Sequence, residues 1–307
     1  MSAIIETEHL SRRYRWTEAV HDLTLSVPEG SIFAFVGPNG AGKTTTIKTV
    51  MNILPPSSGR ATVLGVDSTR LGPAQFREIG YVSENQELPG WMTVSQLLAY
   101  LAPLYPAWDA AFAEELRHQL DLPGDRRIAT FSRGMRMKTA VLSSLAYRPR
   151  LLVLDEPFAG LDALVRDEVV QGVLELAGQA RWTVFIASHD IDEVERLADW
   201  IGVIDAGRLR VAEPVPSLLA RFRSVEVTFP GDAAMPFPIP EGWLVPEVSG
   251  RVLRFVHAES SEPRLEERIR EAAGGAESVE LAPMTLKAVF LALARTFRSG
   301  DRDGGWQ

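Results

Sequence analysis

The chain has 307 residues, no cysteine and a formal net charge of −8, and hydrophobic residues make up 46% of it. A chain of this size and composition can bury a sizeable core and can form one large domain plus a smaller one. The absence of cysteine excludes disulfides and thiolate chemistry, and the acidic balance disfavours general nucleic-acid binding. We also expect no membrane-spanning segment and no signal peptide, since no long apolar run occurs.

Short apolar runs recur along the first two thirds of the chain and predict buried strands. They lie at residues 31–36, 151–154, 183–187 and 200–204. Helical patterns lie between these runs, which favours an α/β core with a parallel sheet. Alternating apolar and polar residues within the first thirty positions predict strands ahead of this core. Apolar residues at helical spacing over about 92–148 predict a helical insert.

The pattern changes near residue 222, so we expect a large domain at 1–221 and a small one at 222–307. The expected elements of the second domain are strands at 224–229 and 251–256 and helices over about 263–273 and after Thr285. Strands mixed with helices in a short segment predict a small α+β domain.

Residues 37–45, called the phosphate loop below, fit the pattern G-x-x-x-x-G-K-[ST]. Glycines let the backbone wrap closely round an anion, and the exposed N–H groups then point at phosphate oxygens. Lys43 adds a positive charge, and the Thr44 hydroxyl is placed to hold Mg²⁺. A helix expected over 44–51 would add dipole attraction for phosphate. The predicted nucleotide-binding residues of this loop are Gly37, Pro38, Asn39, Gly40, Ala41, Gly42, Lys43, Thr44 and Thr45.

Two carboxylates follow the apolar run at 151–154, and a histidine follows the run at 183–187. At the end of a buried strand Asp155 can orient Mg²⁺, directly or through water, and Glu156 can polarise an attacking water. His189 can bond a γ-phosphate or that water. The ordinary alternatives are a polar turn after a strand and a surface histidine. Both of these interpretations become less plausible because a phosphate loop precedes these residues in the chain.

Ser132 and Gly134 stand at the start of a further predicted helix. A serine hydroxyl and a glycine N–H at a helix start form a second possible anion site. An ordinary serine N-cap is the alternative, and for this segment alone it is the better interpretation.

Together these motifs resemble the ATP-binding subunit of an ABC transporter, in that family's order and spacing, over about residues 3–220. In this resemblance residues 37–45 are Walker A, residues 151–156 are Walker B with the catalytic glutamate, Asp162 lies in the D-loop and His189 is the switch histidine. The resemblance implies a P-loop NTPase core that carries an N-terminal antiparallel β subdomain.

Two motifs differ from the family's usual sequences. The signature loop, usually L-S-G-G-Q, reads F-S-R-G-M at 131–135 and is similar to the form seen in ABC-2-type exporters. The lid segment at 81–86 has Glu84 where the family has glutamine, and Gln86 follows two residues later. A carboxylate at this position could still approach Mg²⁺. Residues 283–293 are similar to the C-terminal ending of ABC-2-type ATPases.

The resemblance implies ATP and Mg²⁺ as cofactors. The implied catalytic residues are Lys43, Glu156 and His189, and the implied metal ligands are Thr44, Asp155 and Glu84. Outside the phosphate loop, the implied nucleotide contacts are Tyr14, Ser132, Gly134 and Asp162. Tyr14 would stack on adenine, with Trp16 as a competitor for this role and core packing as the alternative for both.

The resemblance also implies partners. A second ATP-binding subunit, in a homodimer or a heterodimer, would face the first head to tail, so that each ATP lies between Walker A of one and the signature loop of the other. Integral membrane permease subunits would dock on the helical insert, with residues 87–92 as the candidate contact. The chain would be a peripheral subunit at the cytoplasmic face of the cell membrane, would power export of an unknown substrate, and would bind no nucleic acid.

Other classes of function fit less well. A soluble ABC-type ATPase acting on DNA would carry long coiled-coil insertions, and one acting on ribosomes would carry two cassettes. A regulatory subunit that binds ATP without turnover would not need the intact set of Lys43, Asp155, Glu156 and His189. Within transport, importers more often keep L-S-G-G-Q and the lid glutamine.

Overall fold

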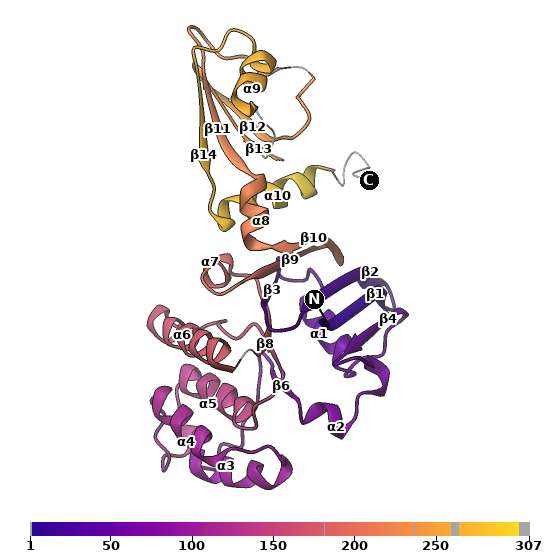
Figure 1. The fold of residues 1–307 in the computed structure, drawn as a ribbon, viewed down its shortest axis with the longest axis vertical. Coiled ribbons are helices and arrows are strands. Elements are labelled where there is room, and N and C mark those ends of the chain that lie inside the picture. Colours follow the sequence, from indigo (N-terminus) through magenta and orange to yellow (C-terminus); the bar gives the residue numbers. More distant parts are fainter. Residues whose placement is uncertain (1, 181, 237, 259–263, 301–307) are drawn as a thin grey trace. The chain divides into compact units, whose positions relative to one another are not determined.

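The computed structural model describes residues 2–180, 182–236, 238–258 and 264–300 (Figure 1). The chain divides into two compact units, Met1–Ala212 and Glu213–Gln307. This division precedes the boundary expected after residue 221. The reason is that helix α8 (Val215–Arg221) contacts helix α10 (Leu286–Gly300) of the second unit.

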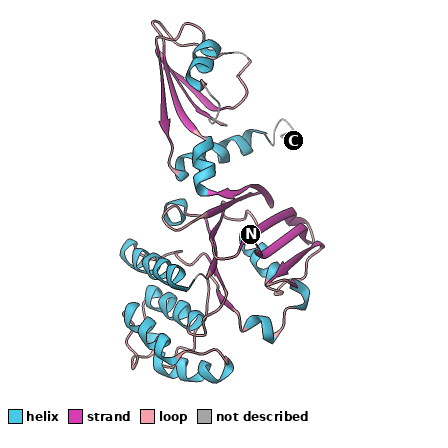
Figure 2. Ribbon diagram, in the orientation of Figure 1, coloured by secondary structure: helices cyan, strands magenta, loops and turns pink. Residues whose placement is uncertain are grey.

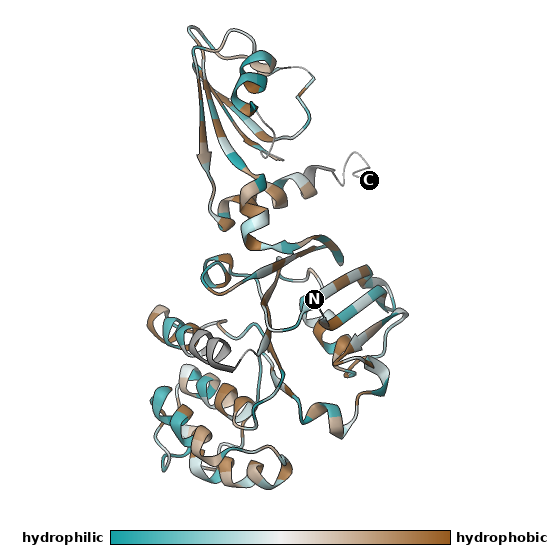
Figure 3. Ribbon diagram, in the orientation of Figure 1, coloured by the Kyte–Doolittle hydropathy of each residue, from teal (hydrophilic) through white to brown (hydrophobic). Residues whose placement is uncertain are grey.

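A six-stranded sheet forms the centre of the first unit. In spatial order its strands are β10 (Arg208–Pro214), β9 (Trp200–Asp205), β3 (Ile32–Val36), β8 (Thr183–Ser188), β7 (Leu151–Asp155) and β6 (Ile79–Val82). The four pairings from β9 to β6 are parallel. β3, β7 and β8 are buried along their whole length, and Figure 3 colours β3 as hydrophobic. Parallel strands covered on both faces read as continuous apolar runs, which is why the sequence predicts them.

An antiparallel sheet packs beside this centre (Figure 2). Its order is β2 (Thr17–Pro28), β1 (Ala3–Tyr14), β4 (Ser58–Val63) and β5 (Val66–Asp67). Apolar side chains of β1 and β2 share one buried cluster with those of the parallel strands. Within that cluster the Phe185 ring lies 5.7 Å from the Phe33 ring and 5.6 Å from the Phe35 ring. The two sheets of the first unit therefore share a core.

Helices complete the first unit. They are α1 (Lys43–Val50), α2 (Pro73–Phe76), α3 (Val94–Leu101), α4 (Ala110–Gln119), α5 (Arg133–Leu145), α6 (Ala163–Ala180) and α7 (Ile191–Val194), with 3₁₀ turns at Ser68–Arg70, Ala102–Leu104 and Ile128–Thr130. The helices α3, α4 and α5 occupy the segment expected to be a helical insert. α5 contacts α3, α4, α6 and β6, and so it links the insert to the sheet.

The second unit contains an antiparallel sheet and helices. The sheet order is β12 (Trp243–Ser249), β13 (Val252–His257), β11 (Arg223–Thr228) and β14 (Ser278–Pro283). Helix α9 (Leu265–Ala273) packs on it through Leu265 and Ile269. Residue 263, the start of the helix expected there, lies outside the described residues. α10 contacts β12 and α8.

The predicted fold class is confirmed: an α/β core carries an antiparallel β subdomain and a helical insert, and a small α+β unit follows. The antiparallel subdomain is interrupted in the chain, since β3 and α1 of the core lie between β2 and β4. Across the part of the chain that the structure describes, no helix is both long and apolar enough to cross a membrane.

Candidate functional site

The phosphate loop connects β3 to α1, and its glycines are required by the space around them. A Cβ on Gly37 would lie 2.2 Å from the carbonyl oxygen of Ile204. A Cβ on Gly42 would lie 2.3 Å from the carbonyl oxygen of Ala19, and Gly42 has φ +109. Only glycine fits such close approaches and such a left-handed backbone. The loop is thus packed directly against β2 and the end of β9.

The turn between β9 and β10 supports the same loop through the backbone. The N–H of Gly207 donates to the carbonyl of Ala41 at 3.0 Å, and the N–H of His21 donates to the carbonyl of Gly207 at 2.8 Å. The turn therefore ties the phosphate loop to β2 through hydrogen bonds that no side-chain motif encodes.

Lys43 is buried at the start of α1, with 5% of its side chain exposed. Its ammonium group donates to the carbonyl oxygens of Gly37 at 2.7 Å and Pro38 at 3.3 Å. The Nζ atom also lies 3.1 Å from Oε1 of Glu156. A buried ammonium needs such partners because desolvation of an isolated charge is costly. The charge is consequently held at the centre of the loop, where a phosphate group would be bound.

Thr44 and Asp155 meet at the base of the loop. The Thr44 hydroxyl donates to Oδ1 of Asp155 at 3.0 Å. Burial raises the pKa of Asp155 above its ordinary value; the Thr44 hydroxyl opposes this rise, and the negative charges of Glu156 and Glu84 add to it. A nearby cation would therefore favour the ionised form of this carboxyl.

A divalent cation fits this oxygen pair in chemical terms. Mg²⁺ is usually held by one or two carboxylates together with substrate phosphates and water. Within the described residues, no group of three histidine or acidic side chains could hold a metal ion. A site formed by Thr44 and Asp155 would need further ligands from the nucleotide, from water or from another side chain such as Glu84, whose charge acts on Asp155.

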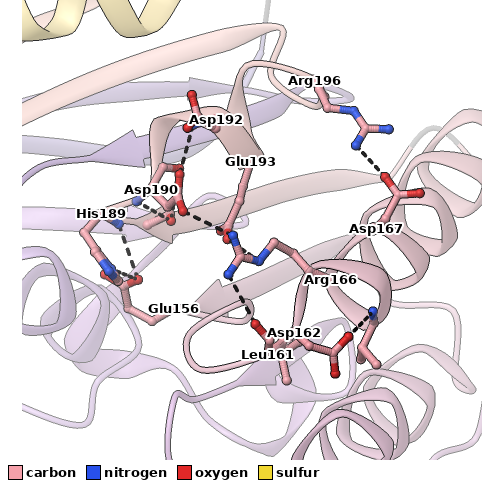
Figure 4. A network of polar contacts seen from close by, with 12 residues as sticks. Glu156, Leu161, Asp162, Arg166, Asp167, His189, Asp190, Asp192, Glu193 and Arg196 are labelled. Atoms are coloured by element: carbon pink, nitrogen blue, oxygen red, sulfur yellow. Dashed lines mark hydrogen bonds and ion pairs between the residues drawn. The ribbon is translucent and has the colours of Figure 1, made fainter.

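Glu156 and His189 lie beside Lys43, at the ends of β7 and β8. Nδ1 of His189 lies 2.7 Å from Oε2 of Glu156, and the His189 backbone N–H donates to the same oxygen at 3.3 Å (Figure 4). Glu156 has φ +52, a left-handed backbone that is unfavourable for most residues other than glycine. Its own N–H donates to the carbonyl of Ala187 at 2.9 Å, which holds this conformation.

The signature loop is placed by α5 and α6. The Ser132 hydroxyl accepts from the N–H of Met135 at 3.2 Å, so Ser132 is an N-cap of α5. A Cβ on Gly134 would lie 2.3 Å from Cγ1 of Val165 in α6. A Cβ on Gly160 would likewise lie 2.4 Å from a guanidinium nitrogen of Arg133. Gly134 therefore has a packing reason within this chain, whereas Gly160 is constrained by its left-handed backbone, with φ +69, because the arginine side chain beside it can move.

The remaining predicted residues lie ahead of α6 and in the β1–β2 hairpin. Asp162 accepts from the N–H of Val165 at 3.0 Å ahead of α6. Tyr14 is 41% exposed, with the Arg12 guanidinium 5.0 Å from its ring centroid, and Trp16 is 96% exposed. Both aromatic rings belong to the β1–β2 hairpin, which also carries Ala19.

The lid segment lies near Asp155 and borders a pocket. Glu84 is exposed, and its charge acts on Asp155. The Gln86 side chain turns back and accepts from the N–H of Ser83 at 3.2 Å and from its hydroxyl at 3.3 Å. The lid residues 84–87 border a pocket of about 460 Å³. The other residues that line it are Phe131, Arg133, Arg136, Met137 and Ala140.

The structure thus brings together Lys43, Thr44, Asp155, Glu156 and His189. Among the described residues, no hydrogen bond or ion pair joins Ser132 or Gly134 to this group. Their roles, and those of the other predicted site residues, stay predictions.

Three charged residues beside the site were not identified from the sequence. Arg166 pairs with Asp190 and with Glu193, as Figure 4 shows. Arg166 lies four positions after Asp162, and Glu193 lies four positions after His189. The helical spacing of Arg166 from Asp162, which directly precedes α6, was the available signal. His189 lies before α7, so its spacing from Glu193 is not a helical one.

A phosphate loop between a parallel strand and a helix, with two carboxylates at the end of a second strand, defines a P-loop ATPase. The sequence matches the ABC transporter family over residues 20–159. It is 32% identical to the bacitracin transport ATP-binding protein BcrA of Bacillus licheniformis over 73% of this chain and 74% of that protein. It is 36% identical to the daunorubicin/doxorubicin resistance ATP-binding protein DrrA of Streptomyces peucetius over 67% of this chain and 63% of that protein.

Solved structures agree. The fold is similar to the structure of an ATP binding subunit of an ABC transporter, with a TM-score of 0.63 and 26% identity over 70% of this chain and 91% of that one. The chain belongs to the ABC transporter family of ATP-binding proteins, and the predicted resemblance is confirmed. It is therefore an ATPase whose hydrolysis is coupled to transport, and the nucleic-acid, ribosomal and non-hydrolysing alternatives are disfavoured.

Proposed function

We propose that this chain powers the export of a substrate through separate membrane subunits, with residues 1–221 as the ATP-binding domain and 222–307 as an accessory domain. One observation carries the catalytic part of the proposal. The carboxylate of Glu156 lies 3.1 Å from Lys43 and 2.7 Å from His189, beside the Thr44–Asp155 pair. Groups for phosphate binding, metal binding and water activation thus converge at one edge of the sheet.

In the proposed mechanism the phosphate loop binds the triphosphate of ATP through its backbone N–H groups and Lys43. Nucleotide phosphates would replace Glu156 as the partner of Lys43. The freed Glu156 carboxylate accepts a proton from the attacking water as a general base. His189 orients that carboxylate and the γ-phosphate.

Thr44 and Asp155 would hold Mg²⁺, with Glu84 as a further ligand. When bound, the ion neutralises charge that develops on the phosphate oxygens. Tyr14 would stack on adenine, and its exposure leaves a ring face available for that contact.

We propose a head-to-tail pair of ATP-binding subunits as the active form. Ser132 and Gly134 stand apart from the Lys43 group in this chain, which supports their contribution in trans to a second nucleotide. Asp162 would lie at the same contact.

The membrane partner is proposed to dock on the helical insert, at the cytoplasmic face of the membrane. Two features of the segment at 87–92 support this: Trp91 is 72% exposed, and Glu87 lines the lid pocket. Met92, by contrast, is 8% exposed and serves the core. Two relatives whose names concern bacitracin transport and drug resistance support export.

Phosphate release from ATP by the purified chain tests the catalytic proposal. We expect turnover that requires Mg²⁺ and falls to background in Lys43→Ala, with Arg60→Ala as a control because its pair with Glu8 is exposed and lies outside the site. Turnover in Lys43→Ala equal to that of the wild type would refute the assigned site.

A further inference from the structure

Arg166 of α6 connects the two segments that carry the D-loop and the switch histidine. Its Nη2 donates to the carbonyl of Leu161 at 3.2 Å, next to Asp162. Its Nη1 donates to Oδ2 of Asp190 at 3.3 Å, and its Nε lies 2.8 Å from Oε1 of Glu193. One guanidinium therefore donates hydrogen bonds to Leu161 and Asp190 and forms an ion pair with Glu193, in which the Nε–H is not aligned for a hydrogen bond. The three oxygens come from two segments (Figure 4).

The position of His189 depends on the same contacts. Asp190, its neighbour in the chain, accepts from the N–H of Asp192 at 3.1 Å and thereby caps α7. The Asp190 N–H donates to the Ser188 hydroxyl at 3.0 Å. The turn that presents His189 to Glu156 is consequently fixed on one side by β8 and on the other by Arg166.

Burial makes the Arg166–Glu193 pair different from a surface ion pair. Only 5% of the Glu193 side chain is exposed, and burial raises the pKa of this carboxyl to about 7. Asp190 and Glu156 add negative charge around it, while Arg166 and His189 oppose the rise. Loss of the Arg166 charge would favour the neutral form of Glu193 still more strongly. Arg166 and Glu193 therefore restrain each other as a buried pair in which the positive charge of Arg166 favours the ionised carboxyl.

A second ion pair joins α6 to the segment that follows α7 and is a surface counterpart of the Arg166–Glu193 pair. Arg196 pairs with Asp167, the residue after Arg166. The side chains are 54% and 47% exposed, and an exposed pair contributes little to stability.

We propose that Arg166, anchored by Glu193, is a positioning residue for ATP hydrolysis that holds the D-loop and the turn bearing His189 in a fixed relative position. This rests on the proposed roles of Glu156 and His189. Arg166 touches neither of them, so it acts through Leu161 and Asp190. Loss of its forked contacts would displace His189 without altering the phosphate loop.

Arg166→Lys in the full chain is the sharpest test. A lysine keeps the charge that Glu193 needs but has a single nitrogen, so it cannot reproduce the separate hydrogen bonds from Nη1 to Asp190 and from Nη2 to Leu161. We expect normal folding by circular dichroism, an unchanged KM for ATP, and a fall in kcat of about 10- to 100-fold, the scale of a small misplacement of catalytic groups. Glu193→Gln should give a similar fall, and the double variant should show no further one.

Asp167→Asn is the matched control and should retain wild-type kcat. A kcat for Arg166→Lys within twofold of the wild type would overturn the proposal, as would a fall in kcat that the Asp167→Asn variant shares. Failure of the proposed function gives another result, since the wild type itself would then release no more phosphate than Lys43→Ala.

Discussion

Replacing Gly134 with alanine separates two reasons for a glycine in the signature loop, packing in this chain and access for a nucleotide. The added Cβ would lie 2.3 Å from Cγ1 and 3.3 Å from Cβ of Val165. Carbon atoms pack at about 3.5–4.0 Å, so α5 and α6 would have to separate or Val165 leave its rotamer. Overpacking of this kind costs about 1–3 kcal/mol. Alanine regains up to about 1 kcal/mol of helix propensity, which leaves a net loss of roughly 0–3 kcal/mol.

Urea unfolding of four chains measures the packing part: wild type, Gly134→Ala, Val165→Ala and the double variant. Removing both Val165 methyl groups eliminates the closest contact. We therefore expect a coupling free energy of about 1–3 kcal/mol between the two positions. Additive free energies, within about 0.5 kcal/mol, would refute the packing argument.

Phosphate release by the same four chains measures whether Gly134 also gives access to a nucleotide. If Gly134 also leaves room for the γ-phosphate of a partner's ATP, the double variant regains stability while its turnover stays low. Full recovery of turnover in the double variant would assign Gly134 to packing alone.

Two further predictions concern the carboxylates of the site. Glu156→Gln removes the proposed general base, so turnover should fall by about 10²–10⁴-fold. ATP should then stay bound, and size exclusion with ATP should show a dimer. A monomer under those conditions counts against the head-to-tail pair. Burial raises the pKa of Glu193 from 4.5 to about 7, so its contribution to stability is fully present below pH 4.5 and is lost as the pH rises through 7. The free energy of unfolding of the wild type, relative to Glu193→Gln, should fall by about 3 kcal/mol over that window. A difference that is constant with pH would contradict this.

Buried strands and motif residues were predictable because a short segment of the sequence is enough to identify each of them. The runs at β3, β7 and β8 are apolar throughout, and parallel strands buried on both faces allow little else. β12 was missed. Pro246 lies in it, and Val245 has φ +49 at a break in its register with β13, so the alternation of a regular strand is lost.

The Arg166 contacts were missed for a different reason. Arg166 and Glu193 form an ion pair although they are far apart in the sequence. The pair follows from how α6 and α7 pack, and the sequence of either helix alone does not specify it. The conformation of the phosphate loop, in contrast, depends on its own glycines, which are visible in the sequence.

The bond from Gly207 to Ala41 determines where the chain can be cut. β10 begins at Arg208, directly after this bond, and continues to Pro214, past the division after Ala212. A shortened chain ending at residue 212 keeps the turn that supports the phosphate loop. A chain ending before Gly207 loses that support although every nucleotide motif is still present.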